Sequence, residues 1–119
     1  MSVLSLSVAP SSAPTNLKAY PMTTTSIFLT WRPPAAESWN GIIRGYYVEI
    51  TDNTRTVSYK SVTDDPYFLV KELRTNHKYT FKVAAYTTEP GPYSNSTISQ
   101  SLKQGVLLQR NMYLNTLPI

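Results

Sequence analysis

Residues 73–86 read LRTNHKYTFKVAAY, and this stretch decides the fold. Tyr79, Phe81, Val83 and Ala85 occupy every second position of its second half. Successive side chains of a strand point to opposite faces, so the alternation predicts a strand with one buried face. The polar residues that follow Leu73 form the connection that leads into this strand.

Six further segments show strand patterns separated by turn residues. Residues 26–31 alternate in the same way, and they end at two prolines, which cannot continue a central ladder of a sheet. The turn dipeptide Asn40-Gly41 precedes an alternating run over residues 43–50, with Gly45 as the position of a bulge. The other strands are expected at residues 15–20 (ending before Pro21), at 55–62, from Phe68 toward Leu73 and, after a turn at residues 89–92, at 96–102. This pattern predicts an all-β, seven-stranded antiparallel sandwich.

The composition disfavours an enzyme. The 119 residues allow one domain, and they contain no cysteine and a single histidine, His77. The chain therefore has no cysteine nucleophile, no zinc-thiolate site and no multi-histidine metal site. We expect His77 to lie in a solvated connection, and Asp64-Asp65 to be turn residues ahead of a proline. No catalytic residue, metal, cofactor or small-molecule substrate is expected.

The charge of the chain is mildly basic, with eleven Lys and Arg against seven Asp and Glu and a formal net charge of +4. The basic residues are scattered singly, which does not favour nucleic-acid binding. They are Lys18, Arg32, Arg44, Arg55, Lys60, Lys71, Arg74, Lys78, Lys82, Lys103 and Arg110. The sequence contains no run of apolar residues long enough to cross a bilayer, and residues 1–10 do not resemble a signal peptide.

Four motifs follow one another along the chain: Pro14 with Leu17; Ser26-Ile27 through Trp31 to Pro33-Pro34; Asn40-Gly41 with Ile43, Tyr46 and Val48; and Leu73 with Tyr79, Phe81, Val83 and Ala85. Together they resemble the fibronectin type III family. The resemblance covers residues 14–102 and implies an immunoglobulin-like sandwich of the fibronectin type III type. It also implies that Tyr79 hydrogen-bonds back along the chain, and that Trp31 and Tyr46 belong to the core with it.

Some family features are absent. Thr87 stands where many members have an asparagine in the loop before the last strand. The chain has neither an Arg-Gly-Asp tripeptide nor a Trp-Ser-x-Trp-Ser signature, so integrin binding and cytokine-receptor function are not implied. We expect residues 1–13 to be an N-terminal linker, residues 14–102 the domain and residues 103–119 a C-terminal extension. The alternating Leu4, Leu6 and Val8 resemble the end of a preceding copy in a tandem array.

A candidate protein-contact face comes from the strand assignments. The resemblance implies that the first, second and fifth strands form one sheet with the second in the middle. Phe28, Tyr67 and Leu69 then lie on its outer face, with Tyr20 near the edge. A register error of one residue, or cover by neighbouring lysine stems, is the alternative. The apolar residues beyond 102, among them Val106, Leu107, Leu108, Met112 and Leu114, are candidates for edge-strand pairing or for a disordered remnant.

Three other positions carry expectations. The outer face of the second sheet is expected to show Tyr47, Glu49, Lys82 and Tyr86, which suits either a reversible protein contact or plain solvated surface. Trp39 either folds over the end of the sandwich or is exposed as an anchor. Asn95-Ser96-Thr97 is the one glycosylation sequon, and a glycan on Asn95 is expected if the protein is secreted.

The resemblance implies a non-catalytic spacer and protein-interaction module of a multidomain cell-surface adhesion or receptor protein. Its partners would be other proteins or neighbouring fibronectin type III domains. The module would lie on the extracellular side of the cell surface and would be attached to the membrane only through its parent protein. The first alternative is a cytoplasmic scaffold module of the muscle type. An accessory domain of a carbohydrate-active enzyme is a third reading, and would require a line of exposed aromatic side chains.

Overall fold

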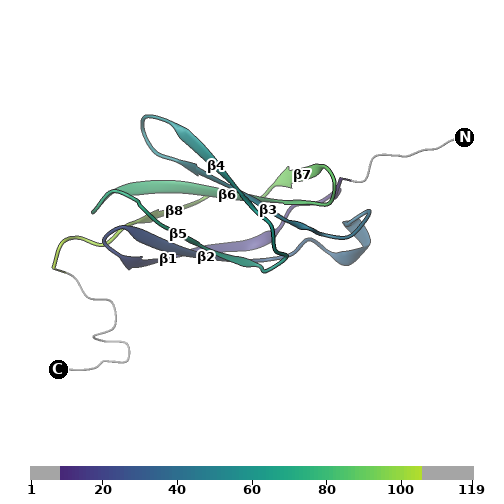
Figure 1. The fold of residues 1–119 in the computed structure, drawn as a ribbon, viewed down its shortest axis with the longest axis horizontal. Helices are drawn as coiled ribbons and strands as arrows, with labels where there is room; N and C mark the ends of the chain where they lie inside the picture. Colours follow the sequence, from purple (N-terminus) through teal and green to yellow (C-terminus); the bar gives the residue numbers. More distant parts are fainter. Residues whose placement is uncertain (1–8, 106–119) are drawn as a thin grey trace, which may run out of the picture.

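The computed structural model describes residues 9–105, which form two β-sheets facing each other (Figure 1). The strands are β1 (Thr15–Thr23), β2 (Ser26–Arg32), β3 (Gly45–Thr51), β4 (Thr56–Ser61), β5 (Tyr67–Val70), β6 (Lys78–Tyr86), β7 (Pro90–Tyr93) and β8 (Thr97–Gln100). One sheet has the order β1-β2-β5. The other has the order β4-β3-β6-β7, with β8 also paired to β6, and all pairings are antiparallel.

The core lies between the sheets and follows the alternation of the sequence. Trp31 of β2 and Tyr46 of β3 meet edge to face, with ring centroids 5.0 Å apart. Tyr79 of β6 lies in the same layer and is also buried. The other buried apolar members are Ile27, Leu29, Ile43, Val48, Ile50, Val70, Phe81, Val83 and Ala85. The predicted sandwich is therefore confirmed, including the position of β2 between β1 and β5.

The prediction of seven strands is wrong in number. Residues 90–92, expected in a turn, form β7 together with Tyr93, and β7 and β8 lie one after the other along β6. Ser94 marks the break between them: its N–H donates to the carbonyl of Val83 over 2.8 Å, and its Oγ accepts the Val83 N–H over 3.1 Å. The prolines of β7 are tolerated because β7 is an edge strand, in which a residue that lacks an N–H can face solvent instead of a neighbouring strand.

The first strand is longer than expected for the same physical reason. β1 continues through Pro21 to Thr23, with a register shift against β2 between Pro21 and Thr23. β1 is an edge strand, so a residue without an N–H can stand where no ladder partner is required. The strand was expected to end before Pro21 because proline interrupts a central strand, but this rule does not hold for an edge strand.

Gly45 opens β3 and is required there by close packing. A Cβ atom at this position would lie 2.0 Å from the carbonyl oxygen of Ser61 and 2.8 Å from the hydroxyl of Tyr86. The Tyr86 hydroxyl in turn donates to the same Ser61 oxygen over 3.0 Å. Tyr86 therefore crosses the start of β3 to reach β4, and only glycine leaves room for it.

Residues before β1 lie against one end of the sandwich. The Ser11 N–H donates to the Ser38 carbonyl over 2.8 Å, in a 3-10 turn over Ala36–Ser38, and the Asn40 side chain donates to the Ala9 carbonyl over 3.0 Å. The expectations for Leu4, Leu6 and Val8 and for the apolar residues beyond 105 fall outside the described residues. Within residues 9–105, no helix is long and apolar enough to span a membrane.

Candidate interaction surface

An apolar row crosses the outer face of the three-stranded sheet. Tyr20 of β1, Phe28 of β2 and Leu69 of β5 are direct cross-strand neighbours. The Tyr67 ring lies against Phe28 with centroids 5.9 Å apart. Tyr20, Tyr67 and Leu69 are 45%, 50% and 40% exposed, and Phe28, in the middle, is half-buried. The sheet thus presents four adjacent apolar side chains to solvent.

The row extends at both edges of the sheet. Met22 is 42% exposed at the β1 end, and Val62, in the loop before β5, is 79% exposed. A shallow hollow lined by Phe28, Leu69 and Tyr67 opens toward that loop. Contiguous apolar surface of this kind is characteristic of protein contacts, whereas isolated apolar side chains are ordinary on any surface.

The outer face of the second sheet is largely occupied by contacts within the chain. The Lys82 ammonium lies 3.3 Å from the Glu49 carboxylate and 5.4 Å from the centre of the Tyr93 ring. Lys60 lies over Tyr86, 4.9 Å from the ring centre. Tyr86 itself is only 7% exposed, so its main role is structural. This face offers fewer unpartnered groups than the apolar row.

Trp39 folds over the end of the sandwich. Its indole N–H donates to the Pro34 carbonyl over 2.7 Å, and its ring packs against the core. Of the two expectations for this residue, the structure shows the first. Trp31, in contrast, has a buried indole N–H without an acceptor in hydrogen-bonding geometry among the described residues.

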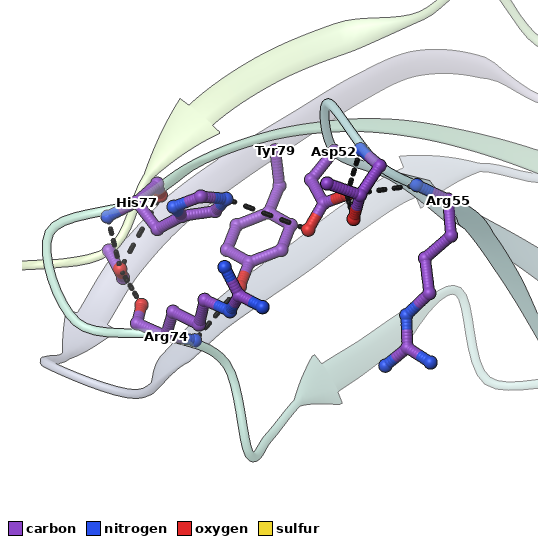
Figure 2. A network of polar contacts seen from close by, with 7 residues as sticks. Asp52, Arg55, Arg74, His77 and Tyr79 are labelled. Carbon is purple, nitrogen blue, oxygen red and sulfur yellow. Dashed lines mark hydrogen bonds and ion pairs between the residues drawn. The ribbon is translucent and has the colours of Figure 1, made fainter.

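His77 is less solvated than expected, because it contacts a carboxylate from a distant part of the sequence (Figure 2). Its Nε2 lies 3.5 Å from Asp52 Oδ2, and its ring meets the Tyr79 ring with centroids 4.9 Å apart. The Asp52 carboxylate accepts hydrogen bonds from the N–H and hydroxyl of Thr54 and the N–H of Arg55. These donors, with a smaller contribution from His77, lower the pKa of Asp52 to about 2.

The model of the fibronectin type III domain matches residues 12–100, three quarters of the chain. The chain belongs to the fibronectin type III family. The domain is 32% identical over 103 residues to mouse receptor-type tyrosine-protein phosphatase F, in a match that covers 86% of this chain and 5% of that protein. It is 34% identical to mouse protein sidekick-1 and 32% identical to the Drosophila melanogaster cell adhesion molecule Dscam1, over 73% and 80% of this chain and 4% of each relative.

Solved structures agree with this fibronectin type III fold. The FN5 domain of Drosophila Lar superposes with a TM-score of 0.65 at 28% identity, covering 79% of this chain and 98% of that domain. The third fibronectin III domain of human KIAA0343 protein gives a TM-score of 0.76 at 16% identity, over 83% and 88% of the two chains. The chain spans only about one twentieth of the curated relatives, and the shared part is the module rather than a catalytic domain.

The fibronectin type III domain shows its family's tyrosine corner. The Tyr79 hydroxyl oxygen accepts the N–H of Arg74 over 2.8 Å, and the ring is 7% exposed. Tyr46 is buried on the neighbouring strand β3, and burial raises the pKa of its phenol. Both tyrosines thus belong to the hydrophobic core.

Asn95 is exposed in the link between β7 and β8 of the domain. Its neighbour Ser94 is buried and donates to the Asn95 carbonyl over 2.9 Å, so the backbone is fixed while the amide side chain faces solvent. Asp64 and Asp65 lie in the loop before β5, and the described residues contain no cluster of three or more potential metal ligands.

Sequence reasoning missed a basic groove at the opening between β4 and the loop after β5. Arg55, Lys71 and Arg74 come from different segments, yet all three line this groove. The lysines and arginines are scattered singly along the sequence, but folding gathers these three. The available sequence signal was the break between the strands expected at 43–50 and 55–62 together with the polar connection after Leu73, because both lie at the same edge of the sandwich.

Proposed function

We propose that this chain is a non-catalytic spacer and protein-interaction module of a multidomain cell-surface adhesion or receptor protein. The observation that carries the proposal is the row Tyr20, Phe28 and Leu69, with Tyr67 beside it, on the outer face of β1, β2 and β5. The occupant proposed for this face is a protein partner or a neighbouring fibronectin type III domain. Its apolar middle and aromatic content are typical of protein contacts.

The relatives support a cell-surface role. Their names are those of a receptor-type phosphatase and a cell adhesion molecule, and in each of them the matched segment is a small part of a long chain. We therefore propose the extracellular side of the cell surface as its place and the parent protein as its only membrane link. Exposed Asn95 is compatible with this. A cytoplasmic scaffold of the muscle type remains the alternative.

The arrangement of the two ends supports a spacer. The described chain begins at one end of the sandwich, beside Ser38 and Asn40, and finishes at the opposite end, where Leu102 donates to the Thr23 carbonyl over 3.2 Å (Figure 1). Domains joined through such ends form an extended array. We propose residues 14–102 as the module, with 1–13 as a linker and 103–119 as an extension.

The test measures binding of the domain, fused to an antibody Fc fragment, to the surface of cells that carry adhesion receptors. Phe28→Ser with Leu69→Ser is expected to abolish that binding and any self-association seen by sedimentation. The matched control is Ile42→Ser with Ile98→Ser, since these isoleucines are 77% and 63% exposed and lie away from the row. Retained binding and unchanged sedimentation in the Phe28 and Leu69 variant, with its fold intact, would reject the proposed face. Binding to insoluble glycans in a pull-down would favour the carbohydrate-associated reading instead.

A further inference from the structure

β4 is an edge strand of the larger sheet, and it is regular along its whole length. It stands first in the order β4-β3-β6-β7, and its pairing with β3 runs from Tyr46 with Ser61 to Thr51 with Thr56 without a register shift. It contains neither a proline nor a bulge, and Lys60 is its only charged residue. Natural edge strands are usually protected by prolines, bulges and charges, and of these β4 has only Lys60, so its backbone edge can act as a template for another strand.

The free backbone groups of β4 can be identified from the hairpin. The Asp52 N–H donates to the Arg55 carbonyl over 3.1 Å, which makes these two residues a hydrogen-bonded pair. Hydrogen-bonded and non-hydrogen-bonded pairs alternate along an antiparallel ladder. The N–H and C=O groups of Thr56, Ser58 and Lys60 therefore point away from β3, and β4 has no other strand neighbour among residues 9–105.

A groove runs beside this edge, between β4 and the segment that follows β5. The side chains of Val57, Tyr59 and Leu73 form its apolar part. Arg55, Lys71 and Arg74 border it, and none of them has an ion-pair partner within 4.0 Å in the described part of the chain. Glu72 and Asp52 also line the groove, so its five charged side chains sum to +1, and the Asp52 carboxylate accepts hydrogen bonds from Thr54 and Arg55.

The loops that carry the two arginines are held in place (Figure 2). Arg74 donates its N–H to Tyr79, and its carbonyl accepts the Ser101 hydroxyl. The same Ser101 oxygen accepts the His77 N–H over 3.0 Å. Arg55 follows the turn that Asp52 closes. Cations on fixed backbone bind an anion with less loss of conformational freedom than cations on loose loops.

We propose that β4 binds an extended acidic segment of a protein partner by strand addition. The segment would hydrogen-bond to Thr56, Ser58 and Lys60, place an apolar side chain against Val57 and Tyr59, and present carboxylates to Arg55 and Arg74. Free backbone groups favour a peptide, since a strand edge gives a polypeptide its main-chain hydrogen bonds and pockets beside it select alternate side chains. A sulfated polysaccharide would use the cations alone. The groove shares no side chain with Tyr20, Phe28, Tyr67 and Leu69, although Lys60 of β4 lines the hollow beside them, so each proposal is tested by its own substitutions.

The experiment uses a blocked peptide, Thr-Glu-Thr-Val-Thr-Glu-Thr, titrated into the isotopically labelled chain and followed by amide chemical shifts. The largest shifts are expected at residues 56–60 and 71–74. Arg55→Gln with Arg74→Gln should weaken binding about fivefold or more, because two charge-assisted contacts are removed. Lys18→Gln with Arg32→Gln removes the same charge from exposed positions outside the groove and should leave the affinity within about twofold.

Ser58→Pro separates backbone pairing from simple charge attraction. The Ser58 N–H points to the free edge, so proline there spares the bonds between β3 and β4 but blocks the added strand. Loss of peptide binding with an unchanged spectrum elsewhere supports strand addition. Full binding by Ser58→Pro, equal weakening by the Lys18 and Arg32 control, or no shifts at β4 would each overturn it. So would binding at the groove of a heparin hexasaccharide but not of the peptide.

Discussion

The hydroxyl oxygen of Tyr79 accepts a hydrogen bond from the backbone N–H of Arg74 over 2.8 Å. This contact joins the start of β6 to the loop that precedes it, and Ser101 holds the same loop from the other side through the Arg74 carbonyl. One tyrosine thereby fixes both a corner of the core and the base of the basic groove.

Tyr79→Phe is expected to lower the free energy of unfolding by about 1–3 kcal/mol, because the Arg74 N–H would lose its acceptor in a partly buried place. Urea denaturation measures the change. Tyr20→Phe is the control, since the Tyr20 side chain is 45% exposed and should change stability by less than about 0.5 kcal/mol. Equal stability of the two variants would show that the corner bond contributes nothing.

The alternation of apolar residues was enough to place the core, and the reason is local. Trp31, Tyr46 and Tyr79 each belong to a run with a period of two, so one buried member fixes the face of all the others. The motif spacing supplied the family, and the resemblance supplied the order of β1, β2 and β5. Both the alternation and the motif spacing are patterns among residues close together in the sequence, and this is why they could be recognised without the structure.

The basic groove and the contact of His77 with Asp52 could not be predicted in the same way. Arg55, Lys71 and Arg74 meet only because two loops finish at one edge of the sandwich, and no sequence spacing records that distance. β7 was missed for a different reason: Pro90 and Pro92 argue against a central strand, and only the sheet order shows that β7 is an edge. The sequence shows which side chains are charged, but only the folded structure shows which of them lie close together.

Gly45→Ala is expected to destabilise the domain by about 3 kcal/mol or more, since the added methyl group would lie 2.0 Å from a backbone oxygen of Ser61 that cannot move independently. Thermal and urea unfolding measure the loss. Faster hydrogen exchange should appear at the paired ends of β3 and β4. Ser58→Ala, an exposed change on β4, provides the control, and a Gly45→Ala protein as stable as this control would contradict the close approach.

The lowered pKa of Asp52 predicts that the domain loses stability in acid. Its pKa is about 2 in the folded domain and near 3.8 ordinarily, so the carboxylate stabilises the fold above about pH 4. That stabilisation should disappear as the pH falls through about 4 toward 2. Asp52→Asn keeps an oxygen acceptor for Thr54 and Arg55 but has no charge to titrate. The stability difference between wild type and Asp52→Asn, from urea curves at several pH values, should shrink over this window, and a constant difference would contradict the assignment.

Asn95 should carry a glycan when the protein passes through a secretory pathway. Its side chain is exposed between β7 and β8, and Ser96-Thr97 completes the acceptor sequon. The measurement is intact mass before and after treatment with an amidase that removes N-linked glycans. Asn95→Gln and Thr97→Ala should each abolish the difference, whereas Asn53→Gln, an exposed asparagine outside any sequon, should preserve it. Protein from the native source gives the decisive test. A glycan on Asn95 in that protein places the domain outside the cell. An unmodified Asn95 in that protein favours the cytoplasmic scaffold, provided that wild type and Asn53→Gln are efficiently modified in secretory expression.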